Sequence, residues 1–407
     1  MKKVIILGAG FAGLHIFYKI RHLIGSKIEL TIVDKRSHSL LKPSLPEVAF
    51  EGANINHSLV ELRHTIESQD AIFIEDEVVS IDAKQNSIEL KNGSSIEYDY
   101  LFVTLGAVKD YDSIKGFRDF GYSVCDDIEA QRLWDRVKSF EGGKIVTGAS
   151  KSSWGSRVDA PKLFAPCEGP IGEIMFMLDY HLRNDKKLQV NKDYQIDVFT
   201  PAEIFFEDVG AKPHEIVGKF MQEKSIKLHN NKILSEIGKD FIAFEDGTKM
   251  DCDLAIVIPP YVAPKVLRDS DIGDDKGFIP TDKQMRHLDY PNIFAAGDIT
   301  ALSQPKLGHI AIIQAGIAAS TFLKDIGEDI EIPPFKLNVF CIMNMGGHEA
   351  ILIDSDYLYK GDTDIAIHSP FSKMMKWGFD NYLYFNKGHM PPDFAMEITD
   401  KLIKFLG

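Results

Sequence analysis

Two of the four cysteines, Cys167 and Cys341, lie in segments that differ from an ordinary core environment. Proline and glycine interrupt regular structure on both sides of Cys167, and a helical pattern begins just after it, at Ile171. Because the N-terminus of a helix stabilises a thiolate, we expect the pKa of the Cys167 thiol to be lowered. Cys341 ends an apolar run and precedes a glycine-rich turn. Both thiols are candidates for redox chemistry, although a free cysteine is most often a small core residue, the role expected of Cys252.

The N-terminal segment has the pattern of a dinucleotide-binding loop. An apolar run at residues 4–7 is followed by glycines at positions 8, 10 and 13 and a helical pattern, and a second apolar run ends at Asp34. In such a βαβ unit the first glycine permits a tight turn, the second admits the pyrophosphate, and the acid reaches the ribose hydroxyls. The free N–H groups at the helix N-terminus bind the anion. The pattern predicts a dinucleotide and leaves open whether it is FAD or NAD.

Two later segments resemble those of flavoproteins with two dinucleotide-binding domains. Residues 290–298 read as a strand that delivers Asp298 at its end, and residues 100–107 read as a short strand with a turn at Gly106. The resemblance implies that the ligand is FAD, that Asp298 holds its ribityl-phosphate side, and that Lys306 stabilises the anionic reduced flavin. The residues expected to bind the cofactor are Gly8, Gly10, Phe11, Ala12, Gly13, Asp34, Lys35, Pro43, Val79, Gly106, Gly297, Asp298, Lys306, Leu307 and Gly308.

The alternation of apolar runs and helical patterns predicts an α/β fold with two Rossmann-like dinucleotide-binding domains. We expect a split FAD domain formed by residues 1–108 and 277–330. An inserted Rossmann-like domain, residues 109–276, carries Cys125 and Cys167. The C-terminal region, residues 331–407, carries Cys341 and a membrane-facing segment.

The inserted domain lacks the features of a nicotinamide nucleotide site. After the apolar run at residues 144–147, residues 148–155 do not follow the GxGxxG pattern and include the bulky Trp154. The next apolar run ends in Thr200 and Pro201 rather than in an acid. Close approach to a pyrophosphate needs glycines, and ribose recognition needs an acceptor. We therefore expect electrons to come from a donor other than a nicotinamide nucleotide, and the thiols are the candidates for their route.

Taken together, several segments resemble sulfide:quinone oxidoreductases, most closely the archaeal branch of that family. The matching segments are residues 121–125, 166–170, 277–282, 305–309 and 339–341. The resemblance implies that Cys167 and Cys341 form a redox pair on one face of the flavin, where hydrogen sulfide is oxidised to polysulfide or sulfur. Cys125 matches the third cysteine of the family, which is either tied to the flavin or sulfur release, or structural. Glu168 either accepts a proton from sulfide or is an exposed carboxylate at a helix start.

Three other functions remain as alternatives. The first two are the flavoprotein subunit of a cytochrome-linked sulfide dehydrogenase and a type II NADH dehydrogenase. The third is a non-catalytic FAD-binding redox sensor whose thiols only switch its conformation. The absence of a recognisable signal peptide disfavours the first, and the degenerate second glycine motif disfavours the second. No catalytic role is expected for His181 or His309, and no cysteine or histidine spacing indicates a metal site.

The segment at residues 372–387 is rich in aromatic residues and methionine, with interspersed lysines. It either packs on the core or dips into one leaflet of a membrane, with the lysines meeting headgroups. By analogy with the family we expect a quinone pocket there, lined by Phe340, Phe371, Trp377, Phe379 and Tyr382. The expected location is the cytoplasmic side of a membrane, as a peripheral or monotopic protein.

The composition is that of an ordinary globular protein. The 407 residues carry a formal net charge of -14 and 44% hydrophobic residues. Lysine and arginine are not clustered, which disfavours a nucleic-acid partner. No apolar run reaches the roughly 20 residues that span a bilayer, and four cysteines do not make a disulfide framework. The formation of a homo-oligomer stays open.

Overall fold

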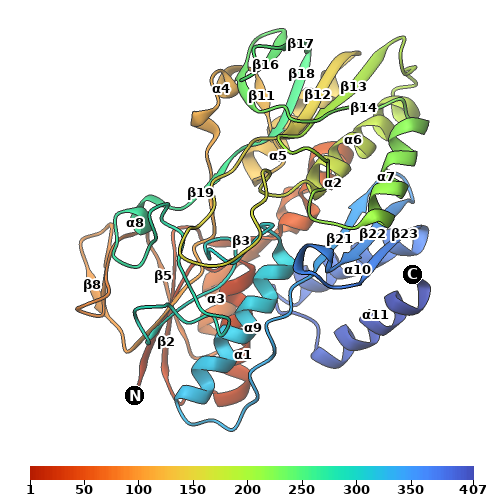
Figure 1. The fold of residues 1–407 in the computed structure, drawn as a ribbon. Coiled ribbons are helices and arrows are strands. Elements are labelled where there is room, and N and C mark those ends of the chain that lie inside the picture. The colour runs from red at the N-terminus through yellow and green to blue at the C-terminus, as the bar shows by residue number, and fades with distance from the viewer.

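The computed structural model describes residues 1–407, apart from the side chain of Asp393. Its first sheet is parallel, in the strand order β20-β9-β1-β2-β5. The five strands are β1 (Lys3–Leu7), β2 (Glu29–Asp34), β5 (Ile72–Glu75), β9 (Tyr100–Val103) and β20 (Ile293–Ala295). Two long helices, α1 (Phe11–Ile24) and α9 (Gly308–Asp325), pack side by side against this sheet (Figure 1). Its central strands are almost fully buried, as is typical of a parallel sheet covered on both faces.

The turn between β1 and α1 depends on its glycines. Gly8 has a φ of +94°, and a Cβ at this position would lie 2.6 Å from the carbonyl oxygen of Thr104. A Cβ on Gly13 would collide with the carbonyl oxygen of Gly8. Only glycine allows α1 to begin so close to the end of β1, and the helix N-terminus consequently faces the carboxyl edge of the sheet.

The second sheet is also parallel, in the strand order β11-β18-β12-β13-β14. Its strands are β11 (Gly121–Tyr122), β12 (Gly143–Ala149), β13 (Tyr194–Phe199), β14 (Lys227–His229) and β18 (Leu254–Ile258). Its main helices are α5 (Asp127–Ser139), α6 (Gly169–Tyr180) and α7 (Ala211–Glu223). The α/β class with two Rossmann-like parallel sheets is confirmed. In the sequence this sheet separates β9 from β20, which are neighbours in the first sheet.

A third, antiparallel sheet near the C-terminus contacts helices of both parallel units. It consists of β21 (Val339–Asn344), β22 (Ala350–Ser355) and β23 (Asp364–Ser369). The strand β21 contacts α6 and α9, and β23 contacts α7 (Figure 1). Cys341 in β21 is thereby held beside the start of α6, which follows Cys167.

Two helices follow this sheet, α10 (Pro370–Phe385) and α11 (Asp393–Leu406). The aromatic segment expected at residues 372–387 is therefore mostly helical. The sequence pattern did not reveal α11, whose last residue is next to the C-terminus. Within the described part of the chain, no helix combines the length and apolar character needed to cross a bilayer.

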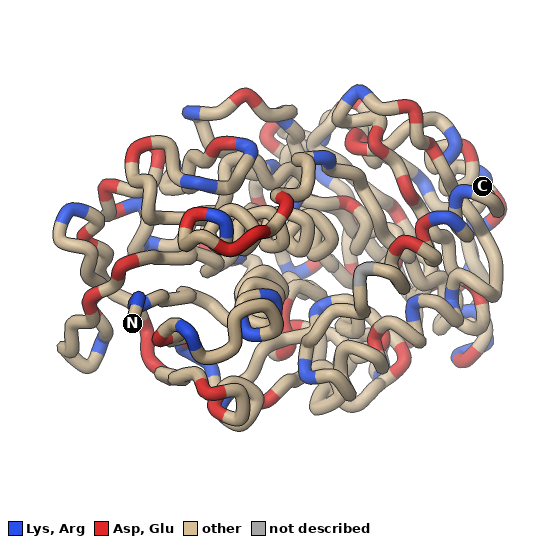
Figure 2. The backbone as a smooth tube through the Cα atoms, turned by 90° about the horizontal axis from the view of Figure 1, so that it is seen from below, with Lys and Arg blue, Asp and Glu red and all other residues tan. Residues whose placement is uncertain are grey.

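Smaller elements complete the fold. The other helices are α2 (Leu45–Glu51), α3 (Leu62–Glu67), α4 (Phe117–Phe120) and α8 (Lys265–Arg268). The other strands are β3 (His38–Leu40), β4 (Leu59–Glu61), β6 (Val78–Asp82), β7 (Ser87–Leu90), β8 (Ser95–Glu97), β10 (Val108–Lys109), β15 (Leu234–Ile237), β16 (Phe241–Phe244), β17 (Lys249–Asp251) and β19 (Tyr261–Val262). Basic and acidic residues are interspersed along the backbone in Figure 2.

Candidate active site

The glycine loop predicted to bind a dinucleotide lies at the carboxyl edge of the first sheet. Asp34, at the end of β2, accepts hydrogen bonds from the backbone N–H of Ala9 at 2.7 Å and of Arg36 at 2.9 Å. Its carboxylate therefore fixes the glycine loop. A Cβ on Gly10 or on Gly106 would meet nothing within 4 Å, so the backbone at both turns faces open space. An open glycine loop at a helix N-terminus fits the pyrophosphate of FAD.

Some of the other residues predicted to bind the cofactor lie where α1 and α9 meet, and others lie at the surface. Gly308 begins α9 after Leu307, and a Cβ on it would lie 3.7 Å from the ring of Phe11. Gly297 lies between α1 and α9. A Cβ on it would lie 3.4 Å from the Cβ of Ala12 on α1 and 3.3 Å from that of Ala311 on α9. Lys35 is exposed, and Val79 is 48% exposed at an irregularity between β6 and β7.

Three lysines converge around Asp298, beyond β20. Lys42 lies 4.0 Å from the Asp298 carboxylate. Burial and the charge of nearby Lys42, opposed by the charge of Asp298, lower the pKa of Lys109 to about 7. Burial likewise lowers the pKa of Lys306 to about 7. Asp298 and, at Lys306, Asp274 only partly oppose this lowering, so a further anion beside the lysines would stabilise their charged forms. That property fits the anionic reduced flavin, and Lys109 was not among the residues predicted from the sequence.

The two predicted redox cysteines, 174 positions apart in the sequence, lie close together in the fold. A Cβ on Gly169 would lie 3.8 Å from the sulfur of Cys167 and 4.0 Å from the sulfur of Cys341. The two sulfur atoms therefore lie within about 8 Å of each other. Cys167 is buried, Cys341 is partly buried, and both are free thiols.

The remaining cysteines differ from each other. Cys125 is buried, and the hydroxyl of Tyr261 donates to its sulfur over 3.6 Å. The ammonium of Lys109 lies 4.3 Å from the centre of the Tyr261 ring, so Tyr261 contacts both Cys125 and a lysine of the group around Asp298. Cys252 packs in an apolar cluster beneath the second sheet with Phe199 and Phe244. The core role expected for Cys252 is confirmed.

The predicted lowering of the Cys167 pKa is wrong. Burial raises the pKa of Cys167 well above its ordinary value, and the negative charge of Asp208 adds to the rise. Burial also raises the pKa of Cys341, again with a contribution from Asp208. The helix N-terminus at Gly169 favours the thiolate, but this effect is smaller than the desolvation of a buried charge. The thiols therefore need a nearby base, or their oxidised form, to react.

Acidic side chains close to the thiols are candidates for that base. Glu168 is only 2% exposed, which corrects the interpretation of it as an exposed helix-start carboxylate. Its Oε2 accepts from the N–H of Phe206 at 2.7 Å, and burial raises its pKa to about 8. Burial also raises the pKa of Asp208 to about 7. The sequence pattern did not single out Asp208, because it lies in a loop without regular structure.

The loop of residues 202–210 is tied to the Cys167 segment from both sides. Glu207 accepts from the N–H of Phe164 at 2.5 Å and from that of Ala165 at 3.0 Å. In the opposite direction, Glu168 of the Cys167 segment accepts from Phe206 in this loop. The reciprocal bonds hold Asp208 close to the thiols.

A buried ion network lies behind Cys341 and was not predicted from the sequence. Lys376 of α10 is 5% exposed and contacts Glu47 of α2 at 2.8 Å and Glu173 of α6 at 3.0 Å. It also donates to the carbonyl oxygen of Pro43 at 2.7 Å. Asn344, at the end of β21, donates its side-chain amide to Glu47 at 2.8 Å. The network joins the elements that carry both redox cysteines to the predicted flavin contact Pro43.

The aromatic residues predicted to line a quinone pocket do not form one cluster. Phe379 packs against the apolar cluster that contains Leu383, and Phe11, next to the glycine loop, packs against the same cluster. Phe340 packs instead with Ile403 of α11, and its ring lies 5.3 Å from that of His309. Tyr382 is partly buried, whereas Phe371 and Trp377 are exposed.

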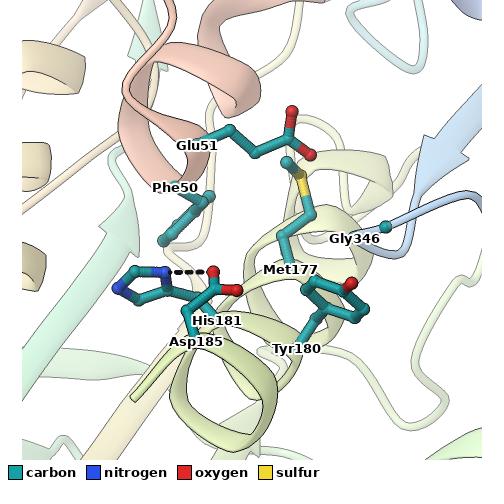
Figure 3. Close-up of a pocket in the computed structure, with 8 residues that line it drawn as sticks. Phe50, Glu51, Met177, Tyr180, His181, Asp185 and Gly346 are labelled. Atoms are coloured by element: carbon teal, nitrogen blue, oxygen red, sulfur yellow. Dashed lines mark hydrogen bonds and ion pairs between the residues drawn. The ribbon is translucent and has the colours of Figure 1, made fainter.

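A small cavity of about 240 Å³ opens at the far end of α6 from Cys167 (Figure 3). Its lining consists of Phe50, Glu51, Met177, Tyr180, His181, Asp185, Gly346 and Gly347. His181 is hydrogen-bonded through Nδ1 to Asp185 at 2.9 Å, as Figure 3 shows. His309 contacts Asn338 at 2.8 Å. These contacts give both histidines partners in the fold.

The two parallel sheets, the open glycine loop and the buried cysteines define the class of protein as a flavin-dependent oxidoreductase. The sequence matches the family described as Pyridine nucleotide-disulphide oxidoreductase over residues 2–150 and 188–315, and the chain belongs to this family. The match omits residues 151–187, which include Cys167, and it ends before Cys341.

Several relatives share most of the chain. The mitochondrial sulfide:quinone oxidoreductase of Mus musculus is 25% identical over 374 residues, which cover 87% of this chain and 78% of the mouse protein. The sulfide-quinone reductase of Aquifex aeolicus is 21% identical, with 99% of this chain and 95% of the relative covered. The solved structure of the Aquifex aeolicus enzyme superimposes with a TM-score of 0.87, at 19% identity over 99% of this chain and 96% of the other.

A second group of relatives matches a smaller part. The type II NADH:quinone oxidoreductase of Staphylococcus aureus is 29% identical over 133 residues, or 32% of this chain and 33% of the relative.

Proposed function

We propose that the protein is a sulfide:quinone oxidoreductase that uses FAD. The observation that carries this proposal is the pair Cys167 and Cys341, which lie within about 8 Å of each other although 174 positions separate them. Relatives named for this activity in Mus musculus, Aquifex aeolicus and Dictyostelium discoideum support it. The proposed domains are residues 1–108 with 277–330 for FAD, 109–276 for the inserted unit, and 331–407 for the C-terminal region.

The chemistry follows from the cysteine pair in its oxidised form. Hydrosulfide attacks one sulfur of the Cys167–Cys341 disulfide, the S–S bond breaks, and one cysteine becomes a persulfide while the other leaves as a thiolate. The persulfide S–H loses its proton to a nearby carboxylate, Asp208 or Glu168. The thiolate sulfur and the deprotonated persulfide sulfur then join in a Cys–S–S–S–Cys trisulfide, which releases two electrons. FAD, when bound, would supply the acceptor for these electrons and the route to a quinone. The net change is the oxidation of HS⁻ to sulfane sulfur with release of one proton and two electrons.

Features of the second parallel sheet support a donor other than a nicotinamide nucleotide. The indole N–H of Trp154 donates to the carbonyl oxygen of Leu163, so this side chain is held in the irregular segment that follows β12. The ammonium of Lys306 lies 5.2 Å from the centre of the Trp154 ring. The bulky indole thus lies toward the flavin lysines, where a NADH-dependent relative would need an open glycine loop.

Exposed apolar side chains support membrane association and a quinone acceptor. On α10 and α11 they are Phe371, Met374, Trp377, Phe385, Phe394, Ile398, Leu402, Phe405 and Leu406. The spacing of Phe394, Ile398, Leu402 and Phe405 puts them on one face of α11. Two neighbouring helices with outward apolar faces fit a peripheral, monotopic protein that lies on one leaflet. Phe379, which shares an apolar cluster with Phe11, marks the side from which the quinone would reach the flavin.

Flavin spectroscopy tests this function. Anaerobic addition of sulfide to the FAD-loaded protein should bleach the flavin, and a soluble quinone analogue should restore its absorbance. Replacing Cys167 or Cys341 with serine should abolish the bleaching, whereas Cys252→Ser, which alters a core thiol beneath the second sheet, should leave it intact. Bleaching by NADH but not by sulfide would refute the proposal and favour the type II NADH dehydrogenase. Bleaching without quinone turnover would favour the cytochrome-linked dehydrogenase or the redox sensor.

A further inference from the structure

A basic cavity of about 420 Å³ lies between α1, α3 and the turn that follows α10. It is separate from the thiol site and from the crevice for the cofactor. Five of its lining residues carry basic side chains: Arg21, His22, His64, Lys387 and His389. The others are Tyr18, Thr65, Ser68, Gln69 and Asn386. Among the described residues, the lining includes no carboxylate.

The guanidinium of Arg21 is fixed in this cavity with one donor left over. Its terminal nitrogens donate to the carbonyl oxygens of Gly25 at 2.6 Å and of Asp70 at 2.7 Å. Arg21 is 7% exposed, and its Nε is buried without a hydrogen-bond partner. The carboxylate of Asp70 accepts from Ser26 at 3.2 Å, and its negative charge opposes the lowering of the Arg21 pKa by burial. The fixed guanidinium places a positive charge at the wall of the cavity, which favours an anionic ligand.

The turn that supplies the other side of the cavity is also fixed. The hydroxyl of Tyr18 donates to the carbonyl oxygen of Lys387 at 2.9 Å, and the ring of Tyr18 lies 4.4 Å from that of His389. Gly388 has a φ of +76°, and a Cβ there would lie 2.8 Å from Leu14. The cavity is therefore preformed, which reduces the entropy cost of binding.

Interaction with helix dipoles explains only part of this arrangement. Arg21 and His22 lie in the last turn of α1, where cations are favourable. That effect does not explain why basic side chains from α3 and from the turn after α10 share the same cavity. The charge of His22 lowers the pKa of His389, in addition to burial, so the two rings repel each other when both are charged. An anion between these segments would relieve that repulsion.

We propose that this cavity binds a phosphate-bearing anion, such as the headgroup of an anionic phospholipid. Its position supports the lipid source, because Phe385, which is 72% exposed, directly precedes the lining residue Asn386. The net charge of -14 repels an anionic bilayer. A local basic site beside the apolar face of α10 would offset this repulsion where the protein meets the membrane. The lipid source rests on the proposed membrane association, whereas the anion site itself does not.

Binding to two probes tests the site. The probes are vesicles of phosphatidylcholine with 30% phosphatidylglycerol, and soluble glycerol 3-phosphate, where about 30% is a typical anionic content. The double variant His64→Ala, Lys387→Ala removes two basic side chains and should weaken binding to the anionic vesicles by about 10-fold. The matched control is Lys27→Ala, an exposed lysine near the end of α1 that pairs with Glu328.

The outcomes separate the two sources of phosphate. Loss of binding to the anionic vesicles alone indicates a lipid headgroup, and loss of glycerol 3-phosphate binding alone indicates a soluble ligand. Equal binding of the wild type and the double variant to both probes would overturn the inference. Reduction of the flavin by sulfide should be unchanged in the double variant. Because the binding assays require no turnover, the anion site can be confirmed even where the proposed function fails.

Discussion

Lys376 on α10 and Glu47 on α2 form a buried ion pair, with the ammonium 2.8 Å and 3.0 Å from the two carboxylate oxygens. Nearby carboxylates raise the pKa of Lys376 against the effect of burial, and Lys376 in turn lowers the pKa of Glu47. This pair connects the C-terminal helices to the segment that follows Pro43. Helix α10, which is proposed to face the membrane, is thus held directly against the segment predicted to contact the flavin.

Replacing Lys376 with alanine should destabilise the protein severely. It would leave Glu47 and Glu173 buried without their cation, and removal of one partner from a buried pair typically costs about 3–5 kcal/mol. The free energy of unfolding, measured with urea, should fall by this amount. Lys373→Ala is the matched control. Lys373 lies one turn away on α10, and its ammonium is farther from its carboxylate partners, at 3.5 Å from Glu51 and 3.8 Å from Glu47. Similar losses in both variants would contradict the special position of Lys376.

Substitution of Asp208 should change the pH dependence of flavin reduction by sulfide. Burial raises the pKa of this carboxyl to about 7, so it can accept a proton only above that pH. The rate in the wild type should therefore rise as the pH increases through about 7. Asp208→Asn should lower the rate and remove this rise, whereas Asp159→Asn, an exposed carboxylate in the segment before Cys167, should retain it. Stopped-flow measurement of flavin absorbance from pH 5.5 to 8.5, a range of about 1.5 units around that pKa, would show whether Asp208 accepts the proton.

Glu168 should make the stability of the protein depend on pH. In the folded state burial raises its pKa from 4.5 to about 8, so between these values the folded chain holds a proton that the unfolded chain releases. The contribution of Glu168 to stability therefore decreases as the pH rises from 4.5 to 8. Glu168→Gln cannot ionise and retains an acceptor for the N–H of Phe206. Its melting temperature relative to the wild type should increase over this range, while exposed Glu203→Gln should show no such trend.

The parts predicted from the sequence are those set by local pattern. The glycines and Asp34 lie within one βαβ unit, so their spacing alone indicated the crevice. The approach of Cys167 and Cys341 followed only from a family resemblance, because β21 must pair in its own sheet and contact α6 to bring them together. The Lys376–Glu47 pair joins residues 329 positions apart, and no local pattern marks it. The raised pKa of Cys167 was missed for a similar reason, since desolvation depends on what packs around the thiol.

The exposed apolar side chains of α10 and α11 should determine membrane binding. Trp377 is 66% exposed and Phe405 is 86% exposed, one on each helix. Burying such a side chain is worth about 1.5–3 kcal/mol, so Trp377→Ser with Phe405→Ser should reduce partition to phosphatidylcholine vesicles by at least about 10-fold. Ile128→Ser is the control, because Ile128 is 72% exposed on α5. Unchanged sedimentation of the double variant with the vesicles would show that these helices do not contact the bilayer.

A methyl group on Gly169 should slow the reaction of the two thiols without destabilising the fold around them. The Cβ of Gly169→Ala would lie 3.8 Å from the sulfur of Cys167 and 4.0 Å from that of Cys341, at ordinary van der Waals distance from both. The fold should therefore accept the substitution, but the methyl group would occupy space that sulfur atoms need between the two cysteines. We expect a melting temperature near that of the wild type and a slower reduction of the flavin by sulfide. Gly218→Ala on α7, where a Cβ meets nothing within 4 Å, is the control for an added methyl group. Reduction at the wild-type rate in Gly169→Ala would show that sulfur does not pass through this space.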